Sequence, residues 1–261
     1  MDPSGFPVAR RPGAARLGPP AALSLGIVCP MANERATAVG FLSSLLRQCD
    51  ALQVGPVRLF VVLDRKCTDG TRELLEAWRQ GEPRLTLIWA PENRCVVDAY
   101  VRGYREALAA GCQWILEIDA GYSHQPEDLP AFLEKLAEGY DCVFGSRFCP
   151  GGQVSETPWQ RRLISRGGTL LANLLLGTRL RDMTSGYELF RRPVLEAVLA
   201  RGIQSRGHFF QTEIKAYCRK WRVAEVPIHY RAASNSVNVR VLKDAFANLW
   251  RLFRLRLSGR L

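Results

Sequence analysis

Apolar and polar positions follow two different periods along this chain. Short apolar runs rich in β-branched residues and bounded by turn formers are typical of strands buried in a parallel sheet. Elsewhere, apolar residues recur every three or four positions, as on the buried face of a helix. These patterns predict strands at 25–29, 57–63, 84–90, 112–119, 140–148 and 222–231, and helices at 33–49, 69–79, 96–111, 125–139, 159–176 and 193–201.

The order of these elements predicts the fold class. Strands that alternate with helices form a parallel sheet covered on both faces, and such sheets bind ligands at the carboxyl ends of their strands. We therefore expect an α/β fold, with Asp64 and Asp119 at strand ends. Asn33 is expected to cap the first helix. Beyond residue 148 the alternation is less regular, and we expect a loop at 181–192.

Residues 239–257 predict a basic amphipathic helix at the C-terminal end. On a helical wheel, one arc holds Leu242, Ala245, Phe246, Leu249, Trp250, Leu252, Phe253 and Leu257, whereas Lys243, Arg251 and Arg254 lie near Arg240 on the other side. Two interpretations remain open. The helix packs on the sheet with its arginines in water, or it lies on an anionic membrane surface, which Trp and Phe side chains suit.

The length of 261 residues and the 47% hydrophobic content favour one large globular domain. We expect a disordered tail at 1–23, a globular α/β domain at 24–236 and the basic amphipathic helix at 237–261. No apolar run approaches the ~18 residues that a membrane span requires. The eight cysteines include no Cys-x-x-Cys pair, which favours reduced thiols and a cytosolic protein.

The net charge of +11 is unevenly distributed. Residues 25–144 hold 12 basic and 17 acidic side chains, whereas residues 145–261 hold 21 basic and 7 acidic ones. The second part therefore predicts an anionic ligand, with a solvated basic surface as the alternative. No nucleic-acid-binding module is recognisable, so we do not expect nucleic acid as a partner.

Six stretches taken together resemble family 2 glycosyltransferases, in the branch of dolichol-phosphate mannosyltransferases and related polyprenyl-phosphate sugar transferases. They are CPMANERATAVGFL, VVLDRKCTDGT, EIDAGYSHQPEDLP, VFGSRF, DMTSGYELFRR and FFQTE, in the order found in the family. The resemblance runs from about residue 24 to about residue 250. It implies a GT-A fold, which is a Rossmann-like, mostly parallel mixed sheet flanked by helices.

The resemblance implies a nucleotide-diphosphate sugar as donor. Glu34, Asp64 and Asp69 occupy the positions expected to contact the base and ribose. The family has a second aspartate after the Asp64 position, and here that residue is Arg65. Asp69 is equally well explained as a turn and helix-capping residue.

The resemblance also implies Mg²⁺ or Mn²⁺ against the diphosphate, because negative charge gathers there as the glycosidic bond breaks. Asp119 matches the first metal-linked aspartate, but Gly121 and Ser123 replace the usual second aspartate and glutamine. Three interpretations stay open. They are a weak metal site completed by substrate phosphates and by Ser123 or His124, a metal-independent site that uses arginines, and an inactive relative.

The acceptor implied by the resemblance is a polyprenyl phosphate. The phosphate oxygen is already anionic, so it needs no strong base to attack the anomeric carbon. It needs cations that hold it in line with the bond that breaks. Arg147 and Arg166 stand where phosphate-binding arginines are expected, with surface arginines as the alternative. Other matches border the sugar and acceptor pocket: Asp182, Ser185, Gly186, Gln211 and Glu213. The Ser-Lys signature expected downstream is only partly kept in SNSVN at 234–238, which leaves the acceptor open.

The leading hypothesis is an inverting glycosyltransferase that acts in the cytoplasm, peripherally on the cytosolic membrane face. A transferase to a sugar hydroxyl is an alternative and would need a base, for which Asp182 or Glu213 are the candidates. A non-catalytic sugar-nucleotide binder is favoured by Gly121 and Arg65. We also leave open a membrane partner protein.

Overall fold

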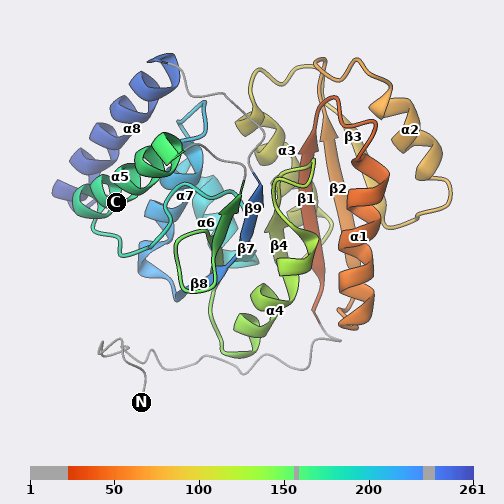
Figure 1. The fold of residues 1–261 in the computed structure, drawn as a ribbon, viewed down its shortest axis with the longest axis horizontal. Helices are drawn as coiled ribbons and strands as arrows, with labels where there is room; N and C mark the ends of the chain where they lie inside the picture. Colours follow the sequence, from red (N-terminus) through yellow and green to blue (C-terminus); the bar gives the residue numbers. More distant parts are fainter. Residues whose placement is uncertain (1–22, 156–158, 232–238) are drawn as a thin grey trace.

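A seven-stranded sheet forms the centre of the computed structural model, which describes residues 23–155, 159–231 and 239–261 (Figure 1). Its strands are β1 (Leu25–Met31), β2 (Val57–Leu63), β3 (Leu85–Trp89), β4 (Trp114–Glu117), β5 (Cys142–Ser146), β7 (Glu188–Arg191) and β8 (Val223–Pro227). The order is β3-β2-β1-β4-β7-β5-β8. Only β7 runs antiparallel to its neighbours in this sheet. The expectation of a mostly parallel mixed sheet is confirmed.

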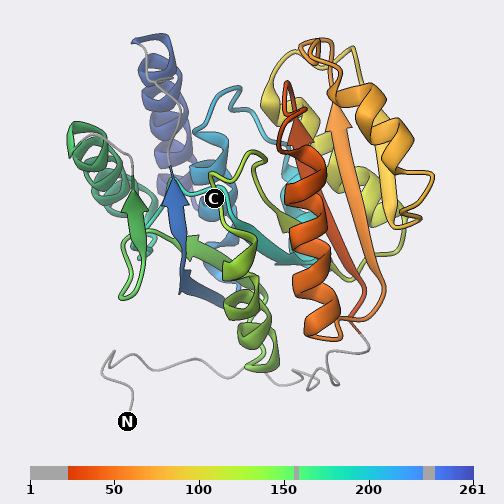
Figure 2. The same ribbon diagram turned by 45° about the vertical axis from the view of Figure 1, so that its right-hand side comes forward.

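Helices cover both faces of the sheet (Figure 2). They are α1 (Ala38–Ala51), α2 (Thr71–Trp78), α3 (Val96–Ala109), α4 (Leu129–Ala137), α5 (Trp159–Leu176), α6 (Arg192–Arg201), α7 (Phe210–Tyr217) and α8 (Val239–Leu257), with short 3-10 turns at Pro126–Asp128 and Cys218–Lys220. One hydrophobic core lies between the sheet and α1, α2 and α4. The other lies between the sheet and α3, α5, α6, α7 and α8.

Strand alternation decides which side chains meet which core. In β4, Leu116 belongs to the α1 and α4 side, and Ile115 belongs to the α3 and α7 side. Because side chains of a strand alternate between faces, Glu117 points to the same side as Ile115. Glu117 pairs across the ladder with Glu188 of β7, which brings two acidic residues together inside the molecule.

Several predicted boundaries were wrong. The first helix begins at Ala38 rather than at Asn33, whose φ of +58° and hydrogen bond from the Thr68 N–H to Oδ1 (2.8 Å) place it in a turn. The predicted loop at 181–192 ends in β7, which is only four residues long and so shows no clear strand period. The helix α7 was not predicted at all.

The predicted strand at 222–231 is two strands. The first, β8, ends at Pro227, and the N–H of Ile228 after it still donates to the Ser146 carbonyl at 3.2 Å. The second, β9 (His229–Arg231), pairs in parallel with β6 (Gln153–Ser155) in a separate two-stranded sheet. This small sheet lies next to α5 (Figure 2).

The C-terminal helix packs on the protein along one side. Leu249 and Leu252 of α8 are buried in the core that also holds Ala172 and Leu176 of α5, and the two helices lie side by side (Figures 1 and 2). No helix in the described ranges is long and apolar enough to cross a bilayer.

The expected tail and domain boundary stay predictions. Residues 1–22 and 232–238 lie outside the described residues, and so does the SNSVN stretch. Leu23, the last residue of the expected tail, is described and buried.

Candidate active site

Asp119 lies two residues after β4, at the carboxyl edge of the sheet, with 44% of its side chain exposed. The Tyr100 hydroxyl of α3 donates a hydrogen bond to Oδ1. His124 Nδ1 lies 3.6 Å from Oδ2. The carboxylate is therefore held in place from one side and open to solvent on the other.

Gly186, from the predicted sugar and acceptor pocket, lies next to Asp119 and to Gln211. A Cβ atom placed on Gly186 would lie 2.7 Å from Nε2 of Gln211 and 3.5 Å from Oδ2 of Asp119. A larger residue at this position would require the Gln211 side chain to move. The carbonyl of the neighbouring Ser185 accepts a hydrogen bond of 2.5 Å from Lys215 Nζ. The Ser185 hydroxyl is buried and has no hydrogen-bond partner among the described residues.

Arg147 and Arg166 lie on the same aromatic ring. Each guanidinium carbon is 5.1 Å from the centre of the Phe148 ring, a cation–π distance. Arg166 is exposed on α5. The side chain of Arg147 is only 10% exposed and forms a fork with Asp182, with Nε–Oδ2 at 2.7 Å and Nη2–Oδ1 at 2.8 Å.

Asp182 is fully buried and ionised in this pair. Burial opposes ionisation, but the Arg147 guanidinium outweighs it and lowers the pKa of the Asp182 carboxyl. The Arg147 N–H also donates to Asp182 Oδ2 at 3.1 Å. Asp182 therefore anchors Arg147 at the end of β5.

His124 connects the Asp119 carboxylate with the Arg147 guanidinium. Its ring centre is 5.1 Å from that of Tyr230, and the Tyr230 ring in turn lies 5.2 Å from the guanidinium carbon of Arg147. His124 is 1% exposed, and neither ring nitrogen has a hydrogen-bond partner in the described structure. Burial lowers the pKa of His124 despite the nearby Asp119 carboxylate, so the ring is neutral at pH 7.

The three predicted donor-side residues gather at the ends of β1 and β2. Asp64 follows β2, is 9% exposed, and accepts the Lys66 N–H at 2.8 Å. Asp69 accepts the N–H of Thr71 at 2.9 Å and the N–H of Arg35 at 2.9 Å. The hydrogen bond from the Thr71 hydroxyl lowers the pKa of Asp69. Such hydrogen bonds are typical of a turn and capping residue, which was the alternative interpretation of Asp69 from the sequence.

Glu34 lies in the turn between β1 and α1. Its N–H donates to Thr71 Oγ1 at 2.9 Å, and its Oε2 accepts the Thr37 hydroxyl at 2.5 Å. The carboxylate is thereby fixed at the start of α1 rather than free to move in solvent.

Glu213 lies on α7, inside the molecule. It is fully buried and accepts hydrogen bonds from Ser205 Oγ (2.5 Å), Tyr217 Oη (2.7 Å) and Arg251 Nη2 (2.5 Å). Although burial opposes ionisation, these donors lower the pKa of Glu213. Its carboxylate ties α7 to the preceding loop and to α8.

Sequence reasoning missed three buried charges beside Asp119. Glu117, Glu188 and Lys215 are all at most 1% exposed, and Lys215 Nζ lies 2.7 Å from Glu188 Oε1. Tyr104 and Gln211 donate hydrogen bonds to Glu117. Burial, followed by the charge of Glu188, raises the pKa of Glu117. The sequence does contain a signal for the two buried glutamates, because Glu117 and Glu188 each interrupt an apolar strand sequence, WILEID and YELF.

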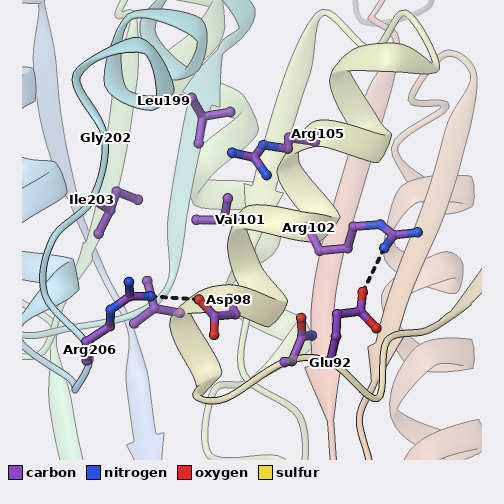
Figure 3. A pocket seen from close by; sticks show the side chains of 11 residues that line it. Glu92, Asp98, Val101, Arg102, Arg105, Leu199, Gly202, Ile203 and Arg206 are labelled. Atoms are coloured by element: carbon purple, nitrogen blue, oxygen red, sulfur yellow. Dashed lines mark hydrogen bonds and ion pairs between the residues drawn. The ribbon is translucent and has the colours of Figure 1, made fainter.

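A separate hollow of about 410 Å³ lies between α3, α6 and the loop after α6 (Figure 3). Ion pairs of Arg206 with Asp98 (2.9 Å) and of Arg102 with Glu92 (3.2 Å) stand around it. None of the site residues predicted from the sequence lines this part of the described structure. We therefore place the candidate site at Asp119.

A GT-A-like sheet with an accessible carboxylate at a strand end is the arrangement of a nucleotide-sugar-dependent glycosyltransferase. The model of the family Glycosyl transferase family 2 matches residues 26–199. This chain belongs to that family and is a glycosyltransferase, so the resemblance seen in the sequence is confirmed.

Two curated relatives are similar over most of the chain. A polyprenol monophosphomannose synthase of Mycolicibacterium smegmatis is 30% identical over 207 residues, which are 78% of this chain and 76% of that protein. An undecaprenyl-phosphate mannosyltransferase of Micrococcus luteus is 34% identical over 172 residues, which are 65% of this chain and 70% of that protein. Both names match the branch indicated by the sequence.

Solved structures of glucosyl-3-phosphoglycerate synthase from Mycobacterium tuberculosis share the fold. One, in complex with Mn²⁺, uridine diphosphate and phosphoglyceric acid, has a TM-score of 0.65 at 20% identity and covers 94% of this chain and 84% of that one. Another, with Mg²⁺ and uridine diphosphate, has a TM-score of 0.63 at 18% identity, covering 90% and 80%. The likeness confirms the expected fold.

Proposed function

We propose that this protein transfers a sugar from a nucleotide-diphosphate sugar to the phosphate of a polyprenyl lipid, with inversion at the anomeric carbon. The observation that carries the proposal is the row Asp119, His124, Tyr230 and Arg147, in which successive contacts connect a carboxylate with a guanidinium. The names of the two curated relatives support the lipid acceptor and make mannose the first sugar to test.

The donor would lie at the ends of β1, β2 and β4. Asp64 is the carboxylate proposed for contacts to the base and ribose, since the side chain of Asp69 is engaged in its turn. The Glu34 carboxylate, expected there from the sequence, lies beside Gly121 instead. Gly186 and Gln211 would border the sugar, next to Asp119. The carboxylate of Asp119, open on one side, would face the diphosphate through a cation.

The residues around Asp119 fit a divalent ion such as Mg²⁺ or Mn²⁺. His124 is buried beside the carboxylate, and neither of its ring nitrogens has a hydrogen-bond partner in the described structure, so a further polar ligand would satisfy it. No group of three acidic, histidine or cysteine ligands occurs in the described ranges. Phosphate oxygens of the donor would therefore complete the coordination, and the bound ion would compensate the charge of the leaving diphosphate.

The acceptor phosphate would be held by the two arginines on Phe148. Arg166 is exposed and supplies a guanidinium to the phosphate oxygens. Arg147, fixed by Asp182, adds positive potential and keeps the ring in place. The acceptor oxygen would form the new bond to the anomeric carbon while the bond to the diphosphate breaks, and no proton has to move.

Transfer to a sugar hydroxyl fits the site less well. Such an acceptor needs a base, yet Asp182 is committed to Arg147 and Glu213 to its buried donors. A lower pKa also makes each carboxylate a weaker base.

We also propose that α5 and α8 form the membrane contact, through a surface that we call the α5–α8 apolar surface. Its side chains are exposed and lie in one stripe on each helix at helical spacing: Trp159, Leu163, Ile164, Leu170 and Leu174 on α5, and Leu242, Phe246, Trp250 and Leu257 on α8. Soluble proteins rarely leave so many large apolar side chains together in water.

The charges beside this surface favour an anionic lipid surface as its partner. Arg166 on α5 and Lys243 and Arg254 on α8 are exposed near the apolar stripes. Trp and Phe with flanking basic residues suit the interface between lipid headgroups and acyl chains. Peripheral attachment to the cytosolic membrane face, with or without a membrane partner protein, is the location that we propose.

Turnover tests the proposed function. The purified full-length chain is offered nucleotide-diphosphate sugars, mannose among them, with a short-chain polyprenyl phosphate or a sugar hydroxyl acceptor, with Mn²⁺ or with a chelator. We expect product with the lipid phosphate and a loss of at least about 100-fold in Asp119→Asn. Product only with the hydroxyl acceptor would favour the alternative transferase, and nucleotide binding without any product would favour a non-catalytic relative.

Flotation with vesicles of phosphatidylcholine and phosphatidylserine tests the membrane contact. Leu170→Glu and Trp250→Glu each place a charge on the α5–α8 apolar surface and should reduce the bound fraction severalfold. Leu52→Glu, which makes the same change at an exposed residue at the end of α1, is the matched control and should bind as the unaltered protein does. Equal binding by all variants would contradict the proposed contact.

A further inference from the structure

We propose that Glu34 supplies the second carboxylate of the divalent-cation site, in the space that Gly121 leaves open. This inference rests on the proposed function, because the cation would be the one that faces the donor diphosphate. It answers the question raised by the sequence, in which Asp119 is present and the aspartate expected two residues later is replaced by glycine.

The Glu34 carboxylate lies directly beside Gly121. A Cβ atom placed on Gly121 would lie 2.9 Å from Oε1 and 3.0 Å from Oε2 of Glu34. The acidic group from the β1–α1 turn therefore fills the volume that a side chain at 121 would need. Gly121 also has a φ of +74°, a conformation that glycine adopts without strain.

The local structure fixes this carboxylate and leaves one oxygen available. Oε2 accepts the Thr37 hydroxyl at 2.5 Å, and the Glu34 carbonyl accepts the N–H of Ala38 at 2.7 Å. Among the hydrogen bonds of the described residues, none is made to Oε1. A ligand oxygen held by its neighbours loses little conformational freedom when it binds an ion.

Asp119 and Glu34 follow two neighbouring parallel strands, β4 and β1, at the same edge of the sheet. Two carboxylates on one side of the sheet edge repel each other unless a cation lies between them. The β1–α1 turn and the β4–α4 loop thus contribute one acidic group each.

The environment of His124 independently indicates a ligand at this place. Its side chain is 1% exposed, has no hydrogen-bond partner in the described structure and directs Nδ1 to Oδ2 of Asp119 at 3.6 Å. A buried polar group is normally satisfied, so an unpartnered one beside the Asp119 carboxylate indicates a further polar partner at this place. The neutral ring can orient the Asp119 carboxylate or accept a water bound to the ion.

Mn²⁺ binding tests the assignment without relying on turnover. The signal of free Mn²⁺ in electron paramagnetic resonance is titrated with the full-length protein, alone and with uridine or guanosine diphosphate. Glu34→Gln should raise the dissociation constant for Mn²⁺ by about tenfold or more, and Asp119→Asn should do at least the same. Glu73→Gln makes the same change at an exposed residue in the first turn of α2 and should have no effect.

Moving the carboxylate gives a second, more specific test. In Gly121→Asp the new side chain collides with Glu34, so Mn²⁺ binding should not improve. In the double variant Glu34→Ala with Gly121→Asp, the collision is removed and a carboxylate returns to the same space. The double variant should bind Mn²⁺ about tenfold more tightly than Glu34→Ala. Thermal unfolding of every variant shows whether it is folded.

The outcomes separate this inference from the proposed function. Unchanged Mn²⁺ binding in folded Glu34→Gln, with binding lost in Asp119→Asn, would overturn the role of Glu34 and leave the transferase intact. Absence of Mn²⁺ binding by the unaltered protein, together with transfer in the presence of a chelator, would also overturn it and would favour a site that uses arginines alone. Rescue in the double variant supports the assignment even if the acceptor proves to be different.

Discussion

At the scale of single residues, the least expected feature is a set of buried charges behind the active site. Glu117 and Glu188 face each other across two strands, and Lys215 of α7 is the cation buried with them. An ion pair away from water survives only with good geometry and further hydrogen bonds. Lys215 meets this condition, since it also donates to the Ser185 carbonyl at 2.5 Å. It thereby holds the loop that carries Gly186 against Asp119.

Lys215→Met should lower the free energy of unfolding by about 3 kcal/mol, because it leaves buried carboxyl groups without their cation. Urea denaturation measures this loss. Adding Glu188→Gln to Lys215→Met removes the remaining charge of the pair and should recover most of the loss. If the double variant is no more stable than Lys215→Met, the pair does not act as a unit.

Stability should also depend on pH through Glu188. Burial raises the pKa of Glu188 from 4.5 to about 7, although Lys215 opposes the shift. Between these values the folded protein keeps a proton that the unfolded chain has released, so raising the pH lowers the free energy of unfolding until about pH 7. Urea denaturation across this range should show a shallower decline for Glu188→Gln. Identical slopes would mean that Glu188 does not carry this dependence.

At the scale of elements, a glycine allows α3 to pack closely on β1. A Cβ atom on Gly103 of α3 would lie 2.3 Å from Cγ1 of Val28. The glycine therefore sets the distance between this helix and the sheet. Because α3 carries both Tyr100 and Tyr104, that distance also positions the hydroxyls that hold Asp119 and Glu117.

Gly103→Ala should destabilise the protein by about 2 kcal/mol, because either α3 or Val28 has to move. Gly168→Ala in α5 is the matched control. No atom lies within 4 Å of its Cβ position, and alanine in an open helical site should stabilise by about 0.5 kcal/mol. Thermal unfolding compares the two, and equal effects would contradict the packing argument.

Elements with a long, regular apolar pattern were predicted well, whereas β7 and α7 were not. The helices at 96–111 and 159–176 nearly match α3 and α5. In contrast, β7 has four residues and α7 only eight, and both are held in place by neighbours distant in the sequence. Such elements obtain their stability from tertiary pairing, which leaves little periodic signal.

At the scale of the whole molecule, the uneven charge and the uncovered apolar stripes concern the same part of the chain. The basic excess lies in residues 145–261, and α5 and α8, which carry the α5–α8 apolar surface, belong to this range. An anionic lipid surface would meet both the cations and the apolar side chains of this part.

Binding to vesicles that contain phosphatidylserine should therefore fall as sodium chloride is added, because salt screens the attraction of the basic side chains. A part of the binding should persist at high salt, since insertion of Phe246 and Trp250 is apolar. Flotation over a salt series measures both parts. Binding that vanishes completely would mean that charge alone holds the protein to the lipid.

The sequence by itself determined the alternation of strands and helices, the family, the charge distribution and the candidate residues Asp119, Arg147 and Arg166, because these depend on local pattern and motif. Tertiary structure decided which partners those residues meet. Asp182 anchors Arg147, Glu213 joins α7 to α8, and Glu34 fills the space beside Gly121. These contacts join segments far apart in the chain, and the local periodicity of a sequence carries no information about such distances.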